Sequence, residues 1–164
     1  MSEEGSPAAG RRTTNVRMTF HRRPTSVPPD VRPEWRVPLL LLMVHSCRGE
    51  LASQEQLHVL NSAILRRGAQ RTLLAALDGR LASNSQIVQF EPALSRAIDR
   101  CTGLGLLGLD SGGRLRLTDL GRGVVAAVES SETLFTTERA LLAALPRPLT
   151  QTAIRTALAH RQTL

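Results

Sequence analysis

The chain has 164 residues, 41% of them hydrophobic, which is enough for one modest core and too apolar for a wholly disordered protein. With three Phe, one Trp and no Tyr, that core must be built from Leu, Ala, Val and Ile. All 21 basic residues are arginine, the formal charge is +7 and the pI is near 11.4. This balance favours a polyanion or an acidic protein surface as partner, but the arginines are spread along the chain and do not decide between them.

The longest apolar run, Val37 to Val44, is far shorter than the roughly 20 residues that a membrane-spanning helix needs. The arginine-rich leader before it is too long for a secretory signal, and no small-x-small cleavage site follows. We therefore expect a cytoplasmic protein.

The two cysteines, Cys47 and Cys101, fall on the expected core faces of two helices and are interpreted as small buried hydrophobic residues. Together with His45 and His58 they contain no ligand pair with the short spacing of zinc sites. No metal and no other cofactor is expected.

Residues 1–33 are rich in Ser, Thr, Pro and Arg and show no helical or strand period, which predicts a disordered arm. Its arginines either lie along a phosphate backbone or an acidic partner, or belong to a solvated tail. The candidate nucleic-acid contacts in this arm are Arg11, Arg12, Arg22 and Arg23.

Residues 34–47 predict a first helix that is apolar around most of its circumference and is therefore either central or covered by a partner. Its candidate partner contacts are Leu39, Leu42 and Met43. Ser53 and Gln56 form a capping-box pattern at the start of the next helix. On that helix His58 falls opposite the apolar stripe and is expected to be exposed.

A third, shorter helix is expected at about 69–77, followed by a loop at 80–89 and a first strand at 87–90. A helix-turn-helix reader joins its two helices by a turn of three or four residues. The longer interval here means that the geometry for pressing the next helix into a major groove is not assured.

Pro92 is well placed as the first residue of a helix over 92–103. Leu94, Ala97, Ile98, Cys101 and Leu104 recur on one face of it. Two short runs joined by Ser111-Gly112-Gly113 then predict a hairpin, with Leu115 and Leu117 on one side and Arg114 and Arg116 on the other. Thr118 is expected to cap a further helix, with a buried stripe formed by Leu120, Val124, Ala127 and Val128.

Two more helices are expected in residues 131–164, the first capped by Thr136 or Thr137 and ending at Leu145, the second starting at Thr150. Leu141, Ile154 and Leu158 are the candidate partner or dimer contacts of this region, although packing on their own domain is an equal alternative.

The glycines between Gly103 and Gly108 match the G-x-G-x-x-G dinucleotide pattern, but a helix leads into them and a strand follows. That order presents no helix N-terminus to a pyrophosphate, so a nucleotide site is not expected. The chain also lacks a P-loop, H-E-x-x-H or G-x-S-x-G motif. A non-catalytic protein is the resulting expectation.

The helix at 92–103 and the hairpin have two functional interpretations. In one they contact DNA, the helix through Arg96 and Arg100 and the hairpin region through Arg114, Arg116 and Arg122. Against this, Asp99 lies in the middle of the helix's polar face and would repel phosphates, and it is also placed to pair with the neighbouring arginines. In the other, the domain docks on a larger protein.

The stretch FEPALSRAIDRCTGLGLLGLDSGGRLRLTDLGRGVV resembles MarR- and PadR-like winged-helix regulators. Together with RPEWRVPLLLLMVHSC and LASQEQLHVLNSAIL, it is similar to the middle components of bacterial ABC-three-component systems. The resemblance covers about residues 33–130. It implies association with an SMC/Rad50-like ABC ATPase and an effector subunit in defence against phages, and it identifies no catalytic residue.

The expected fold is therefore mainly α (α+β), a winged helix at 34–130 with a two-stranded β-hairpin wing and additional C-terminal helices. The expected function is a non-catalytic adaptor that docks on the ATPase of a defence complex and contacts DNA with its arm and wing. The alternative is a dimeric transcription regulator that contacts a DNA groove directly.

Overall fold

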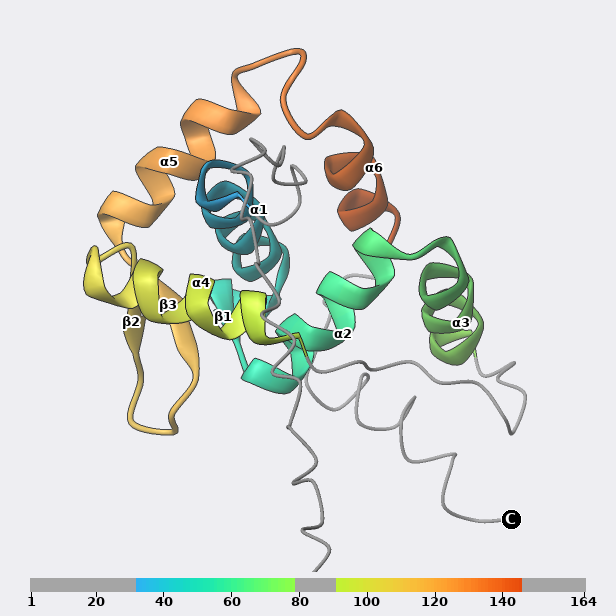
Figure 1. The fold of residues 1–164 in the computed structure, drawn as a ribbon, viewed down its shortest axis with the longest axis horizontal. Coiled ribbons are helices and arrows are strands. Elements are labelled where there is room, and N and C mark those ends of the chain that lie inside the picture. The colour runs from blue at the N-terminus through green and yellow to red at the C-terminus, as the bar shows by residue number, and fades with distance from the viewer. Residues whose placement is uncertain (1–31, 79–90, 146–164) are drawn as a thin grey trace, which may run out of the picture.

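The computed structural model describes residues 32–78 and 91–145, and these form a mainly helical protein with one small antiparallel sheet (Figure 1). In chain order the elements are α1 (Pro33–Ser46), a 3-10 turn η2 (Arg48–Glu50), β1 (Leu51–Ala52), α2 (Gln54–Leu65), α3 (Arg67–Leu77), α4 (Pro92–Gly103), β2 (Leu107–Leu109), β3 (Leu115–Leu117), α5 (Asp119–Glu129) and α6 (Thr136–Ala144). The arm, the strand expected at 87–90 and the last helix expected from Thr150 lie outside the described residues.

Helix α1 is the centre of the core, with α2, α4, α5, α6 and β3 packed around it (Figure 1). Every side chain from Leu39 to Val44 is at most 3% exposed, so the helix buries all of its sides in this stretch. A helix that is apolar all round is stable only when it is covered in this way. No helix within the described ranges is long and apolar enough to cross a membrane.

The sheet has the strand order β1-β3-β2, with both neighbouring pairs antiparallel. Leu115 and Leu117 are buried and Arg116 is exposed, as the alternation predicted. The hairpin turn places Gly113 at φ +71°, a conformation that glycine adopts without a steric penalty. Strand β1 was not predicted, because two residues are too few to show an alternating pattern.

Helix α4 begins at Pro92 and buries Leu94, Ala97, Ile98 and Cys101, as predicted. Leu104 was expected on the same face but is 55% exposed. The reason is that the helix ends at Gly103, after which Gly105 at φ +68° turns the chain towards β2.

Helix α5 is capped by Thr118, whose hydroxyl accepts from the backbone N–H of Gly121 at 3.1 Å and donates to the carbonyl of Gly105 at 2.7 Å. Of its expected stripe, Val128 is buried and Val124 is half-buried, but Leu120 and Ala127 are exposed, and Gly121 and Val125 are buried in their place. The missing side chain of Gly121 lets the α5 backbone lie directly against the carbonyl of Leu106. This close approach turns the glycine side of the helix inward.

Three further helix starts can be compared with the sequence. Ser53 and Gln56 form the predicted capping box of α2. Helix α3 begins at Arg67, two residues before its expected start. Helix α6 is preceded by Phe135 at φ 52° without a side-chain cap, so neither Thr136 nor Thr137 caps it. The Phe135 ring instead packs on Trp35, with 5.9 Å between the ring centroids.

Candidate functional site

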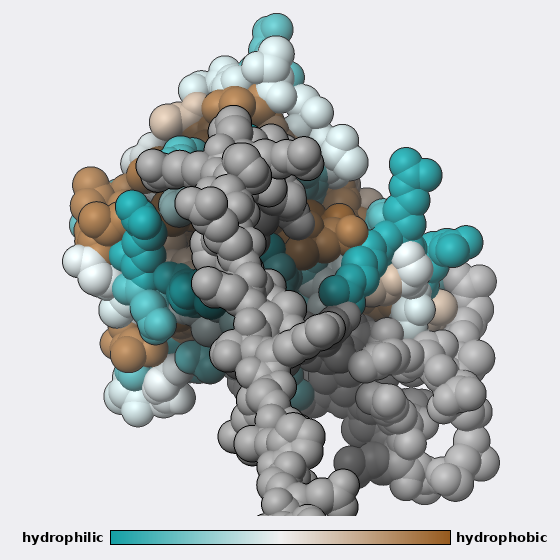
Figure 2. Space-filling view, in the orientation of Figure 1, coloured by the Kyte–Doolittle hydropathy of each residue, from teal (hydrophilic) through white to brown (hydrophobic). Residues whose placement is uncertain are grey.

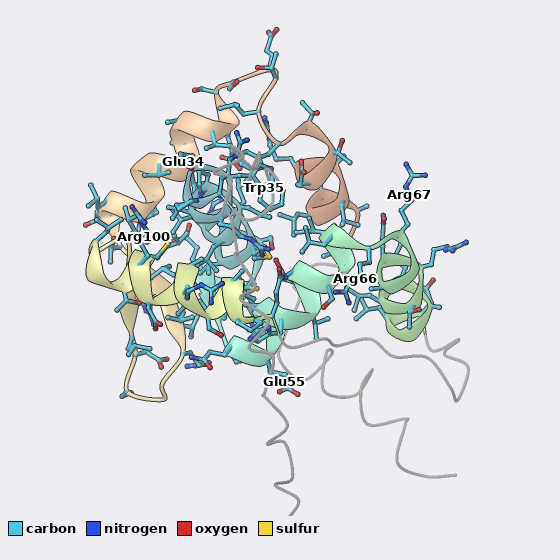
Figure 3. The ribbon with its side chains drawn as sticks, in the orientation of Figure 1. Glu34, Trp35, Glu55, Arg66, Arg67 and Arg100 are labelled. Atoms are coloured by element: carbon cyan, nitrogen blue, oxygen red, sulfur yellow. The ribbon has the colours of Figure 1, made fainter. Side chains whose placement is uncertain are left out.

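The exposed side of α4 carries the two arginines that were predicted to contact nucleic acid. Arg96 and Arg100 are exposed one turn apart, and Asp99 is exposed beside them. Within the described residues no ion pair joins Asp99 to either arginine, so the expected ion-pair cluster does not form there. In Figure 3 Arg100 extends outward from the C-terminal half of α4. Both arginines therefore keep their charge available on this helix.

Arg114 is held by the hairpin that carries it. One carboxylate oxygen of Asp110 accepts from the backbone N–H groups of Gly112 and Arg114, at 2.9 and 2.8 Å, and the other pairs with the Arg114 guanidinium at 2.8 Å. The Arg114 backbone N–H, with that guanidinium and the N–H of Gly112, lowers the pKa of Asp110. The predicted wing contact Arg114 is thus already paired with a carboxylate of its own turn.

Arg122 is engaged in the same way. Its guanidinium pairs with Asp119 at 2.6 Å and with Glu50 at 2.8 Å, and the hydrogen bonds that it donates to Asp119 and Glu50 raise the pKa of Arg122. Burial alone would raise the pKa of Glu50, but the hydrogen bonds and charges of Arg122 and His45 together lower it. The Arg122 side chain therefore joins α5 to η2 within this chain.

Arg116 differs from the other wing arginines. It projects from the middle of β3, opposite Gly108 of β2 and Leu51 of β1, and its side chain is exposed. Among the ion pairs of the described ranges none involves Arg116. Of the five predicted arginines in the described part, Arg96, Arg100 and Arg116 have the most accessible charge. Arg11, Arg12, Arg22 and Arg23 lie outside the described residues.

The predicted partner contacts on the first helix require a correction. Leu39, Leu42 and Met43 are 1%, 3% and 1% exposed and pack inside the core, so in this fold they offer no surface to a partner. The sequence left open whether this apolar helix is central or covered by a partner protein. In the structure α1 is central and is covered by its own chain. Leu141 is 9% exposed and borders an open groove of about 640 Å³ between α6 and the α2–α3 pair. Ile154 and Leu158 lie outside the described residues.

Exposed leucines lie elsewhere, where α4 ends and the hairpin and α5 begin. Leu104, Leu109 and Leu120 are 55%, 64% and 61% exposed. Figure 2 shows hydrophobic surface over this end of α4 and the start of α5, and again over the hairpin. We call these three residues the leucine patch. Single exposed leucines are ordinary, and these three lie in two areas with hydrophilic surface between them, so together they are a candidate contact region.

A buried polar network connects α1, α2 and the start of α4. Both terminal nitrogens of Arg36 bond to the Glu91 carboxylate, one of them also donates to Asn61 at 3.0 Å, and Asn61 donates to Glu91. Arg36 is 3% and Asn61 1% exposed. Burial alone would raise the pKa of Glu91, but the hydrogen bonds from Arg36 and Asn61 with the charges of Arg36 and Arg66 lower it. The sequence analysis missed this network, although a lone arginine inside an apolar helix is a signal that a carboxylate partner must exist.

The expectation that His58 is exposed was wrong, because the side chain is 5% exposed. Burial lowers the pKa of His58, and the negative charge of Glu91 opposes part of that effect. The imidazole is therefore held in its neutral form over a wider pH range than in an unfolded chain.

Neither cysteine has the environment of a nucleophile. Cys47 and Cys101 are both buried and not in a disulfide, and burial raises the pKa of each thiol to about 11. A thiol with so high a pKa is protonated at neutral pH and is a poor nucleophile and metal ligand. Within the described ranges no group of three or more His, Cys, Asp or Glu residues could hold a metal ion.

A small cleft separates the start of α1 from α4. Its volume is about 170 Å³, and its lining consists of Pro33, Arg36, Val37, Ala93, Arg96, Ala97 and Arg100. The cleft brings the two predicted α4 arginines together with Arg36, which the sequence did not associate with them. A wider groove of about 620 Å³ lies between α6 and the ends of α1 and α5.

Comparisons with known proteins add no assignment, since no protein family, no curated protein and no solved structure matches the chain. Function therefore has to be inferred from the arrangement of side chains.

Proposed function

We propose that this protein is a non-catalytic winged-helix adaptor that acts in the cytoplasm by binding a larger protein, with DNA as a second and weaker partner. The partner implied by the resemblance of residues 33–130 to the middle components of ABC-three-component systems is an SMC-like ABC ATPase of a defence complex. Binding would proceed through surface contacts and requires no reacting group.

The order of elements supports the winged-helix part of this proposal. A winged helix has a short strand after its first helix that pairs with the second strand of the hairpin. Here β1 follows α1 and pairs with β3, and β3 pairs with β2. Helix α4, directly before the hairpin, then has the position of the helix that would face a duplex. The chain departs from the winged-helix order in one place, because α3 and residues 79–90 separate α2 from α4 in the sequence.

The distribution of charge and apolar surface around α4 favours a protein partner, and this observation carries the proposal. Arg114 and Arg122 are neutralised by carboxylates of their own fold, and Asp99 is exposed beside Arg96 and Arg100. Leu104 of the leucine patch lies directly after the same helix, Leu109 ends β2 and Leu120 lies in α5. Direct groove readers use unpaired arginines against phosphates, whereas exposed leucines suit a protein surface.

Arg116 and the arginines of residues 1–33 are the observation that favours the second function, a dimeric regulator that binds DNA directly. Their charges would give sequence-independent affinity for phosphates. We keep DNA contact as the weaker activity, because Arg116 is the only wing arginine of the described part without an ion pair.

The proposal predicts that a large ATPase is encoded beside this protein, and it is tested by co-expression of the two. The wild-type chain should co-purify with the ATPase, and the variant L104S/L109S/L120S should lose it. Leu134→Ser is the matched control, since Leu134 is an exposed leucine (49%) away from α4 in the turn before α6, and it should retain the ATPase.

Two results would contradict the adaptor. One is the absence of an ATPase gene or of co-purification. The other is binding of duplex DNA by the isolated protein with sequence preference and nanomolar affinity at physiological salt, which would favour the regulator.

A further inference from the structure

The α1–α4 cleft combines apolar walls with positive charge. Ala93 and Ala97 stand one turn apart on α4, and their small side chains leave the space that Pro33 and Val37 border from α1. Arg96 and Arg100 have the same spacing and stand at the exposed side of the cleft. A ligand that fits these features has a short apolar stem and an anionic end.

Arg36 lines the cleft and carries a buried donor that has no partner within the described residues. Its terminal nitrogens are occupied by Glu91 and Asn61, but its buried Nε makes no hydrogen bond within the described residues. A buried donor without an acceptor is costly, and each one in a folded protein calls for an explanation. This atom belongs to a residue that is 3% exposed and that lines the cleft, so the site contains more than two surface charges.

The size of the cleft limits what it can bind. Pockets for whole small molecules or cofactors occupy roughly 300–1,000 Å³. A volume of about 170 Å³ is below that range and corresponds to one side-chain-sized group of a larger partner. Arginines bind carboxylates through paired, charge-assisted hydrogen bonds.

We propose that the α1–α4 cleft receives one aspartate or glutamate side chain of the protein partner, with its stem against the alanines and its carboxylate between Arg96 and Arg100. This inference rests on the proposed adaptor function for the kind of partner and adds the chemistry that the partner must present.

A protein carboxylate fits better than a DNA phosphate because of Asp99. A duplex carries a phosphate on each strand about every 3.4 Å along its axis, so several of them would approach an exposed carboxylate on the same helix. A peptide can place a single acidic residue in the cleft and neutral residues near Asp99.

The test uses the full chain and the probe acetyl-Ala-Leu-Glu-Leu-Ala-amide, with the same peptide containing Gln in place of Glu as its control. Titration is followed through the backbone amide NMR signals of Ala93 and Ala97. The Glu peptide should shift these signals saturably, and the Gln peptide should bind at least about tenfold more weakly, since a charge-assisted pair is lost.

Three variants locate the binding. R96Q/R100Q removes the charge, and Ala93→Leu fills the cleft without changing any charge; each should weaken the Glu peptide at least about tenfold. R67Q/R71Q is the matched control, because these arginines are exposed with the same spacing on α3, and Figure 3 shows Arg67 on the opposite side of the view from Arg100. This control should bind within about twofold of wild type, and thermal melts verify folding of all three.

The inference is overturned by an absence of saturable shifts, by equal affinity for the Gln peptide, or by unchanged binding in R96Q/R100Q or Ala93→Leu. If a twelve-base-pair duplex shifts the same amide signals, and its binding is lost in the same variants, the cleft would be reassigned to a phosphate group. Because the readout needs no ATPase, its failure is distinguishable from failure of the leucine-patch experiment.

Discussion

Glu91 is the carboxylate on which the burial of Arg36 depends. The variant Glu91→Gln keeps the shape and the hydrogen-bond acceptor but leaves the buried guanidinium without a counter-charge. Removing one partner of a buried pair costs about 3–5 kcal/mol. The Glu91 side chain is 25% exposed, so we expect a loss of about 2–4 kcal/mol in the free energy of unfolding.

Urea unfolding at pH 7 measures this loss. Glu132→Gln is the control, because Glu132 is an exposed carboxylate whose replacement should change stability by less than about 0.5 kcal/mol. Equal stability of the two variants would mean that the Arg36–Glu91 pair contributes nothing to the fold.

His58 gives the stability a pH dependence of its own. Its folded pKa lies below the ordinary value of 6.5, so the unfolded chain takes up the proton first as the pH falls. The contribution of His58 to the free energy of unfolding is complete above pH 6.5 and is lost as the pH falls towards the lower folded pKa. The slope of this loss is at most about 1.4 kcal/mol per pH unit. Urea unfolding of His58→Gln should show a flatter profile than wild type between about pH 7 and 5.5.

The lowered carboxyl pKa values of Glu91 and Glu50 act in a separate, more acidic window. Both carboxylates contribute stability above their ordinary pKa of 4.5, and it is lost as the pH falls through the lowered folded values. The difference between His58→Gln and wild type should therefore develop above this window. Identical profiles of the two proteins near pH 6 would contradict the assigned burial effect.

At the scale of elements, α5 is positioned by the absence of one side chain. A Cβ built on Gly121 would lie 2.2 Å from the carbonyl oxygen of Leu106, whereas one on Gly123 would meet nothing within 4 Å. Gly121→Ala must push α5 away from the hairpin, and overpacking of this kind costs about 1–3 kcal/mol or more. Gly123→Ala, two residues along the same helix, should instead stabilise by about 0.5–1 kcal/mol through helix propensity.

Thermal melts of these two glycine variants should shift in opposite directions. Equal shifts would mean that helix propensity alone decides both sites and that the close approach of α5 to Leu106 is not a constraint.

The same glycine explains which parts of the fold could be predicted from the sequence. The α2 capping box and the α4 core face follow from local rules, and both are confirmed. The α5 stripe was only partly right, because Gly121 faces the core and the more hydrophobic Leu120 does not, and the close approach of α5 to the carbonyl of Leu106 decides which of them is buried. Strand β1 is too short to show a pattern and forms by pairing with β3, and α6 begins without a side-chain cap, so local sequence signals identify neither.

The candidate site shows even more strongly that local sequence rules cannot predict contacts between distant parts of the chain. Arg96, Arg100 and Arg116 could be named from helix and strand periodicity, because exposure on one element is a local property. The pairing of Arg114 follows from its own turn, but the Glu50–Arg122 and Arg36–Glu91 pairs join residues 72 and 55 positions apart. Such pairs need the tertiary fold, and they decide which arginines are left for a partner.

For the molecule as a whole, the proposals divide the arginines between two partners, with the cleft for an acidic side chain and the arm for phosphates. Residues 1–31 carry Arg11, Arg12, Arg17, Arg22 and Arg23, and each one that contacts a phosphate adds about 0.9 to the slope of log affinity against log salt. Deleting residues 1–31 should therefore weaken duplex binding and lower that slope by as much as roughly 4.5. The same deletion should leave the affinity for the Glu peptide unchanged, and R96Q/R100Q should have the converse effect. Fluorescence anisotropy of a labelled duplex at increasing salt measures the slope. A slope that the deletion leaves unchanged would mean that the arm arginines do not contact DNA.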